Sequence, residues 1–230
     1  MKERLFHFLF PEVCIVCGKL LMPSEYGCCS SCMNAFETFP DCTAAGHTLL
    51  HSIESHFRGK CSFERAYCRY VYHRNSPLQK ALHAMKYEGM FNLGKAFGRE
   101  LGVWILDAVP SESIDCLVPV PLHPLKRIDR SFNQAEKIAE GMAEVFHKPV
   151  RSDILVRTVY TATQTGLAIS ERRKNLEGAF RTPLSDIPGR ILLVDDVVTT
   201  GSTVVAAASA LRNGGAGSIS VAALALTGKE

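Results

Sequence analysis

The sequence predicts an α/β fold in which helices flank a parallel sheet, with a small N-terminal zinc-binding appendage. From residue 65 onward, short apolar runs alternate with amphipathic segments, the pattern of parallel strands joined by right-handed helical crossovers. Residues 191–203 are the most informative stretch, because four apolar residues lead into two adjacent acids, a loop and an Ala-rich helical segment. Two closely spaced cysteine pairs near the N-terminus predict the appendage.

Composition limits the function classes. Apolar residues make up 47% of the 230 residues and charged residues 21%, values typical of a globular protein able to bury a core. The net charge of +3 is too small to indicate nucleic-acid binding by itself. No apolar run approaches the roughly 18 residues of a membrane helix. Eight of the nine cysteines lie within the first 68 residues, which disfavours a disulfide scaffold and favours a cytoplasmic location.

The N-terminal cysteines have the spacing of a zinc knuckle. Two C-x2-C pairs are separated by eleven residues, and together they supply four thiolates for a tetrahedral site, Cys14, Cys17, Cys29 and Cys32. Four protein ligands leave no position for water, so the predicted role is structural. Two alternatives stay open: a set of reduced, buried cysteines, and Cys28 in place of Cys29.

The remaining N-terminal stretch is less informative. Five residues invite a second metal hypothesis without showing paired spacing: Cys42, His47, His51, His56 and Cys61. The apolar residues 5–10 predict a short helix docked on the body, with attachment to a membrane surface as the alternative. We place the boundary of the appendage near residues 59–65.

The body then shows its elements in order. Residues 65–72 predict a strand, and Ser76 followed by Pro77 predicts the start of a helix that Gly89 interrupts. A second helix is expected over 93–107, with a Met and aromatic stripe that we assign to the core. Residues 116–122 predict a buried strand, followed by a basic loop at 123–127 and by a capping box at Ser131 that opens another helix. Three cations after this strand, Lys126, Arg127 and Arg130, suit a pyrophosphate, and a solvated basic turn is the alternative.

The C-terminal part completes the alternation. A short strand is expected at 154–156, then the strand and loop of 191–203, then a helix over 204–212 stopped by Gly214 and Gly215, and a last buried strand over 219–226. No internal repeat is evident.

The chemistry of residues 195–203 points to a sugar phosphate. A loop that feeds a helix N-terminus directs several backbone N–H groups at one spot, where the helix dipole is positive. Gly201 lets the backbone approach a ligand, and four hydroxyls add donors: Thr199, Thr200, Ser202 and Thr203. Asp195 and Asp196 suit two vicinal hydroxyls, so a ribose 5-phosphate combines both features. The alternative is a buried strand that ends in an ordinary polar turn.

Residues 191–203 resemble the 5-phosphoribosyl-1-pyrophosphate (PRPP) motif of type I phosphoribosyltransferases. Together with the cysteine pairs and five further pieces, the chain resembles the ComF-like competence proteins over nearly its whole length. The pieces are Lys86-Tyr-Glu-Gly, Val118-Pro-Val-Pro-Leu-His-Pro, Ser131-Phe-Asn-Gln-Ala-Glu, Gln164-Thr-Gly-Leu and Glu171-Arg-Arg-Lys-Asn-Leu-Glu-Gly-Ala-Phe. The chain departs from relatives in two places: only Cys42 and Cys61 remain of a second set of cysteines, and Ser131 replaces a glycine.

The resemblance implies a type I phosphoribosyltransferase-like domain over 63–230, with 63–110 as a hood on the acceptor side, after a zinc knuckle and linker over 1–62. The implied ligand is magnesium–PRPP. Asp195 and Asp196 would take the ribose hydroxyls, and residues 199–203 the 5-phosphate. The implied pyrophosphate residues are Val120, Pro121, Leu122, Lys126, Arg127 and Arg172.

Two functions remain open on this evidence. One is an enzyme that transfers a phosphoribosyl group to an unknown acceptor and releases pyrophosphate. The other is a non-catalytic, PRPP-responsive adaptor in DNA uptake, with a protein partner or single-stranded DNA. The acid pair suits both, since a regulatory protein that binds PRPP would keep it as well.

Overall fold

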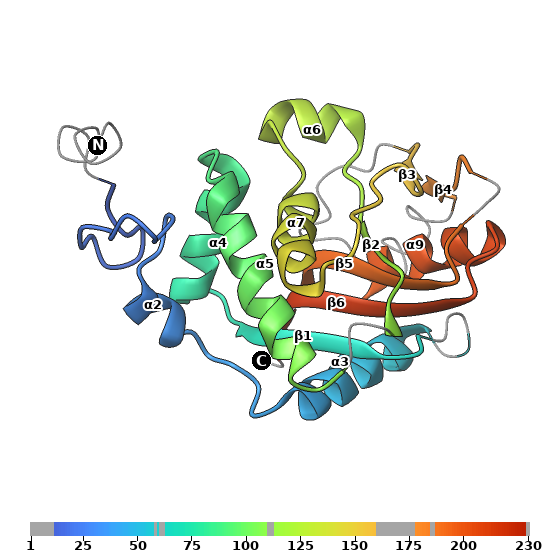
Figure 1. The fold of residues 1–230 in the computed structure, drawn as a ribbon, viewed down its shortest axis with the longest axis horizontal. Helices are drawn as coiled ribbons and strands as arrows, with labels where there is room; N and C mark the ends of the chain where they lie inside the picture. The colour runs from blue at the N-terminus through green and yellow to red at the C-terminus, as the bar shows by residue number, and fades with distance from the viewer. Residues whose placement is uncertain are drawn as a thin grey trace.

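A computed structural model describes residues 12–57, 59, 63–109, 113–159, 178–184 and 187–228. Its centre is a four-stranded parallel sheet (Figure 1) in the order β1 (Ala66–Tyr72), β6 (Ser218–Thr227), β5 (Arg190–Val198) and β2 (Cys116–Pro119). The last strand of the chain, β6, is therefore central and pairs with both β1 and β5. This arrangement confirms the predicted fold class.

Helices cover both faces of the sheet, and β5 shows the division. Leu192 and Val194 pack into one core with α4 (Pro77–Tyr87), α5 (Phe91–Leu106) and α7 (Gln134–Phe146). Ile191 and Leu193 pack into a second core with α3 (Cys42–Phe57) and α9 (Ser202–Asn213). Alternate side chains of a strand point to opposite faces, so the continuous apolar run of β5 is explained by burial on both sides.

The helices α5 and α7 cross at unusually close range. A Cβ on Gly98 would collide with the carbonyl oxygen of Ile138, and a Cβ on Gly141 with that of Lys95. Glycine at the crossing lets the two backbones touch, which fixes α7 tightly on α5 and hence the loop that precedes α7.

The N-terminal part contains α2 (Ser30–Asn34) and α3. Figure 1 shows α2 at the end of the molecule away from the sheet, while α3 lies along β1. The helix α3 buries Ala45, Leu49 and Ile53 against the sheet. Residues 36–59, where the sequence predicted no regular structure, thus supply a helix that covers one face of the body. The position of the domain boundary stays a prediction.

Several details differ from the sequence-based expectations. The expected basic loop contains a short helix, α6 (Pro124–Arg130), capped by His123. Ser131 does not begin α7; it ends α6 in the left-handed region, and Asn133 caps α7 instead. The expected strand at 154–156 is β3 (Val156–Arg157), which pairs antiparallel with β4 (Phe180–Arg181) outside the main sheet. Ser76 caps α4 as predicted, accepting a hydrogen bond from the N–H of Gln79.

None of the helices in the described ranges is long and apolar enough to cross a membrane. The expected N-terminal helix at 5–10 lies outside those ranges.

Candidate functional site

The two adjacent acids lie near the carboxyl end of β5, where parallel sheets place ligand sites. Both belong to the strand itself, which continues to Val198. Backbone N–H groups orient both side chains: Asp195 Oδ1 accepts from the N–H of Asp196 at 2.9 Å, and Asp196 Oδ1 from that of Val197 at 2.7 Å. The carboxyl groups are therefore held in place before any ligand arrives.

A lysine from another element meets the second acid. The Nζ of Lys86, in the last turn of α4, lies 2.5 Å from Asp196 Oδ2. Burial opposes a charge on Asp196, but the ammonium of Lys86 outweighs it and holds the pKa of Asp196 below its usual value. Burial and the neighbouring charge of Asp196 raise the pKa of Asp195 to about 8. The two shifts run in opposite directions, so Asp196 is the member of the pair that holds a negative charge more readily.

The loop after β5 leads directly into α9. Gly201 has φ +83° and is the N-cap of the helix, and no side chain in the described part of the chain caps this end by a hydrogen bond. The hydroxyl of Thr200 lies 3.3 Å from that of Ser202. The first N–H groups of α9 thus face the loop together with hydroxyl donors, as a phosphate site requires.

A cleft of about 260 Å³ joins the acids to a group of cations. Lys126 and Arg130 come from α6 and Arg157 from β3. Burial, followed by the charges of Arg157 and Arg130, lowers the pKa of Lys126; burial also lowers the pKa of Arg157, although Asp195 opposes that shift. Like charges gathered in a partly buried cleft favour a polyanionic ligand.

Two amide side chains tie the start of α7 to the residue after β2 and to Arg130. Asn133 donates from Nδ2 to the carbonyl oxygen of Val120 at 3.0 Å and accepts at Oδ1 from the N–H of Ala135. Gln134, only 1% exposed, accepts from Arg130 Nη1 at 3.2 Å. These contacts give the Ser131-Phe-Asn-Gln-Ala-Glu piece a structural role: it fixes the start of α7 and aims Arg130 into the cleft.

The structure brings most predicted site residues together. Seven line the cleft: Val120, Pro121, Leu122, Lys126, Asp195, Asp196 and Thr203. Thr199, Thr200, Gly201 and Ser202 form the loop that continues from β5. Arg127 does not line the cleft; its side chain is 62% exposed, and its guanidinium lies 3.7 Å from the carboxylate of Glu136. Arg172 lies outside the described residues.

Sequence reasoning assigned no ligand role to four polar residues that line the cleft: Lys86, Asn133, Gln134 and Arg157. Lys86, Asn133 and Gln134 belong to the sequence pieces that carry the family resemblance, but the resemblance assigned them no role in ligand binding. Arg130 was expected from the sequence to meet a pyrophosphate together with Lys126 and Arg127, and it lines the cleft. Arg157 carried no local signal, because β3 brings it to the cleft only in the folded chain.

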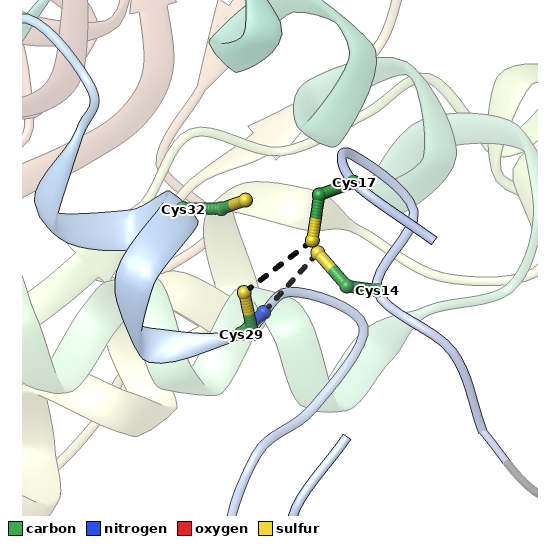
Figure 2. A group of neighbouring side chains, drawn as sticks. All are labelled: Cys14, Cys17, Cys29 and Cys32. Atoms are coloured by element: carbon green, nitrogen blue, oxygen red, sulfur yellow. Dashed lines mark hydrogen bonds between the residues drawn. The ribbon is translucent and has the colours of Figure 1, made fainter. Parts of the chain in front are cut away.

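The four predicted knuckle cysteines converge (Figure 2). Their sulfur atoms all lie within 4.8 Å of one another, and Cys17 Sγ is 3.7 Å from Cys29 Sγ. Zinc–thiolate bonds of about 2.3 Å at tetrahedral angles give a sulfur–sulfur separation of about 3.8 Å. The donor set and spacing therefore fit a structural zinc ion, held by Cys14, Cys17, Cys29 and Cys32.

Cys28 does not belong to this group. Its thiol is directed at the carbonyl oxygen of Cys29, and burial raises its pKa well above the usual range, as expected for a neutral core thiol. The hypothesis of a second metal site finds no support in the described ranges. There, the four knuckle cysteines are the single group of side chains close enough together to bind a metal ion. His47 and His51 are exposed on α3, and Cys61 lies outside those ranges.

Comparisons with known proteins agree with this architecture. Residues 133–230 match the family described as phosphoribosyl transferase domain. The chain is 30% identical to competence protein F of Haemophilus influenzae, over 92% of this chain and 96% of that protein. It is 31% identical to DNA utilization protein YhgH of Escherichia coli strain K12, over 94% and 98%. It is also 31% identical to competence protein ComFC of Bacillus subtilis, over 66% and 61%. The chain belongs to the ComF-like family of competence and DNA-utilization proteins, with a phosphoribosyltransferase-like domain.

Proposed function

We propose that this protein binds magnesium–PRPP in the cleft and transfers its phosphoribosyl group to an acceptor, releasing pyrophosphate. One observation carries the proposal: an acid pair, an uncapped helix N-terminus and a group of cations lie side by side at one edge of the sheet. A ligand that combines a diol, a phosphate and a pyrophosphate would engage all three.

In this proposal, Asp195 and Asp196 bind the ribose hydroxyls, and residues 199–203 hold the 5-phosphate at the start of α9. The pyrophosphate lies toward β2, against Lys126, Arg130 and Arg157. These cations stabilise the charge that develops on pyrophosphate as the bond between C1 and its oxygen breaks. Magnesium enters with the substrate and shields the phosphate charge. The protein contributes mainly orientation of the sugar and the leaving group.

The acceptor is expected on the side of C1 opposite the leaving pyrophosphate. Because the pyrophosphate site adjoins β2, that side faces β6 and the hood over residues 63–110. The sequence gives no convergent polar set there from which to name the acceptor.

A second candidate is a PRPP-responsive adaptor in DNA uptake, with a protein partner or single-stranded DNA. Relatives named for competence and DNA utilization support it. Three apolar side chains near the knuckle cysteines also support it. Val13, Leu20 and Met22 are 51–64% exposed and suit a contact with a protein partner. A cytoplasmic location is proposed with either function, on the ground that the cysteines within the described residues are free thiols.

Calorimetric titration of magnesium–PRPP tests the proposal. The wild-type protein is expected to bind in the micromolar range, about 8 kcal/mol. Replacing Asp195 and Asp196 together by Asn should abolish binding of PRPP while sparing inorganic pyrophosphate. Binding without pyrophosphate release in a screen of acceptors would favour the adaptor; no binding by folded, zinc-loaded wild type would overturn the proposed ligand.

A further inference from the structure

Lys86 closes one side of the candidate ribose site, although no role could be assigned to it from the sequence. It lies in the last turn of α4, which ends where Gly89 adopts φ +71°. Its side chain is 22% exposed and that of Asp196 16%. The ion pair is therefore largely shielded from solvent, where a charge interaction is stronger than at an open surface.

The contacts of Asp196 indicate that Lys86 is the cation that keeps the Asp196 side chain ionised. Oδ1 accepts from the N–H of Val197, and Oδ2 meets the ammonium of Lys86. Three cations face the acid pair: Lys86 on α4 and Arg130 on α6 act on Asp196, and Arg157 on β3 acts on Asp195. Asp195 on β5 is itself the titratable neighbour of Asp196. Lys86 forms an ion pair with Asp196 through its ammonium group.

We propose that Lys86 is the positioning residue of the ribose site: it holds Asp196 as an oriented carboxylate that accepts the hydrogen bonds of a ribose diol. It also offsets the negative charge that would otherwise repel the phosphates of the same ligand. This inference rests on the proposed function and assigns the diol specificity of that site to a residue outside the acid–loop motif.

The neighbouring residue links the same helix to the phosphate side of the cleft. The guanidinium of Arg130 lies 5.5 Å from the centre of the Tyr87 ring, a cation–π distance. Consecutive residues of α4 thus contact an acid of the ribose site and a cation of the pyrophosphate site. This accounts for the grouping of Lys86 and Tyr87 in one short piece of sequence ahead of Gly89.

The test compares Lys86→Met, Lys86→Arg and wild type in titrations with three probes: magnesium–PRPP, ribose 5-phosphate and magnesium pyrophosphate. Lys86→Met is expected to lower the affinity for ribose 5-phosphate and for PRPP at least tenfold, and the affinity for pyrophosphate less than threefold. Lys86→Arg, which can keep the ion pair, should stay within threefold of wild type. The matched control is Lys80→Met, an exposed lysine of the same helix outside the cleft, which should change nothing.

A pH series separates positioning from packing. Without Lys86, the neighbouring Asp195 and burial should keep Asp196 partly protonated near neutrality. The ratio of the wild-type to the Lys86→Met affinity should therefore be largest at pH 6 and shrink toward pH 8.5. Taking the ratio at each pH cancels the titration of the ligand's own phosphates.

Failure of wild type to bind PRPP would overturn the proposed function. Wild-type binding with an unchanged Lys86→Met variant would overturn this inference alone. Equal loss for all three probes, or a ratio that does not vary with pH, would also overturn it, because Lys86 would then act through helix packing or general charge. Thermal unfolding of each variant checks the fold, and Lys86→Gln replaces the Met variant if that one does not fold.

Discussion

Ile53 of α3 packs directly against Gly201 of the loop before α9. A Cβ on Gly201 would lie 2.7 Å from Ile53 Cγ1, closer than two carbon atoms can approach without displacement. The helix α3 therefore supports the candidate phosphate loop, and a segment ahead of the residues that match the phosphoribosyl transferase family shapes the site.

Replacing Gly201 by Ala should destabilise the protein and weaken the binding of PRPP. The left-handed φ of +83° costs a residue with a Cβ about 1–2 kcal/mol, and the collision with Ile53 adds to that. The matched control is Gly215→Ala, at the other end of α9, where φ is +100° and nothing lies within 4 Å of the new Cβ. Urea unfolding measures both, and equal losses would show that the contact with Ile53 contributes nothing.

The stability of the fold should depend on pH through Asp195. Its pKa is raised in the folded chain to about 8, so the unfolded chain releases this proton first as pH rises. The contribution of the side chain to stability is complete below its unfolded pKa and is lost as pH approaches 8. The difference in unfolding free energy between wild type and Asp195→Asn should therefore fall between pH 5 and pH 8, by at most about 1.4 kcal/mol per pH unit. Urea unfolding at several pH values measures this difference. A difference between wild type and Asp195→Asn that stays constant with pH would contradict the prediction.

Two neighbouring cations of α6, Lys126 and Arg127, should differ in their effect on the binding of pyrophosphate. Lys126→Ala is expected to weaken magnesium pyrophosphate about tenfold or more, roughly 1.4 kcal/mol, because this lysine lines the cleft beside Arg130 and Arg157. Arg127→Ala should leave the affinity within twofold, since Arg127 is turned toward Glu136. Calorimetry of the two variants compares neighbouring positions of one helix. A larger loss for Arg127 would restore the assignment made from the sequence.

The adjacent residues Cys28 and Cys29 should differ in their effect on the zinc content of the protein. Cys29→Ala removes a ligand and should abolish stoichiometric zinc and lower the unfolding temperature strongly, because a structural zinc stabilises its lobe. Cys28→Ala should keep one zinc per chain, since Cys28 lies outside the cluster. Elemental analysis of the purified variants gives the answer. A chelator should destabilise the wild type without abolishing PRPP binding; loss of binding by a folded, metal-free protein would refute a purely structural role.

Ser131 is a place where a single change should stabilise the chain. It has φ +65° at the end of α6, a conformation that glycine adopts without strain. Ser131→Gly should raise the free energy of unfolding by about 0.5–1 kcal/mol, the left-handed penalty less the extra entropy of glycine. Ser131→Ala keeps the strain and should show no gain. A decrease for the glycine variant would mean that the serine hydroxyl makes a contribution larger than the backbone cost.

Part of this site could be predicted because its signals are local. The strand, the acids and the loop of residues 191–203 are consecutive, and the C-x2-C pairs identify four ligands by spacing alone. Lys86 and Arg157 could not be assigned in that way, since each reaches the cleft from an element distant in sequence. A charged side chain on a helix or short strand is usually solvated, and only tertiary packing distinguishes the exceptions.

The same contrast applies to the fold. The alternation of strands and helices was visible from residue 65 onward, yet the strand order was not, because pairing with β6 is decided by the whole sheet. The buried face of α3 repeats every four residues at Ala45, Leu49 and Ile53. That periodicity was present in the sequence, but the scattered histidines and cysteines drew attention to metal binding. The helix α6 is only seven residues long, too short for periodicity to reveal it.

The central position of β6 has a consequence for how the chain reaches this structure. β1 pairs with β6 across about 150 intervening residues, for example Ala66 beside Val221. Such distant pairings carry a high entropic cost before they bring any gain and slow folding. During synthesis β1 cannot find its neighbour until the C-terminal strand has left the ribosome. A chain that stops before residue 218 would keep an unpaired apolar strand, so nascent chains of this protein are expected to depend on chaperones until translation is nearly finished.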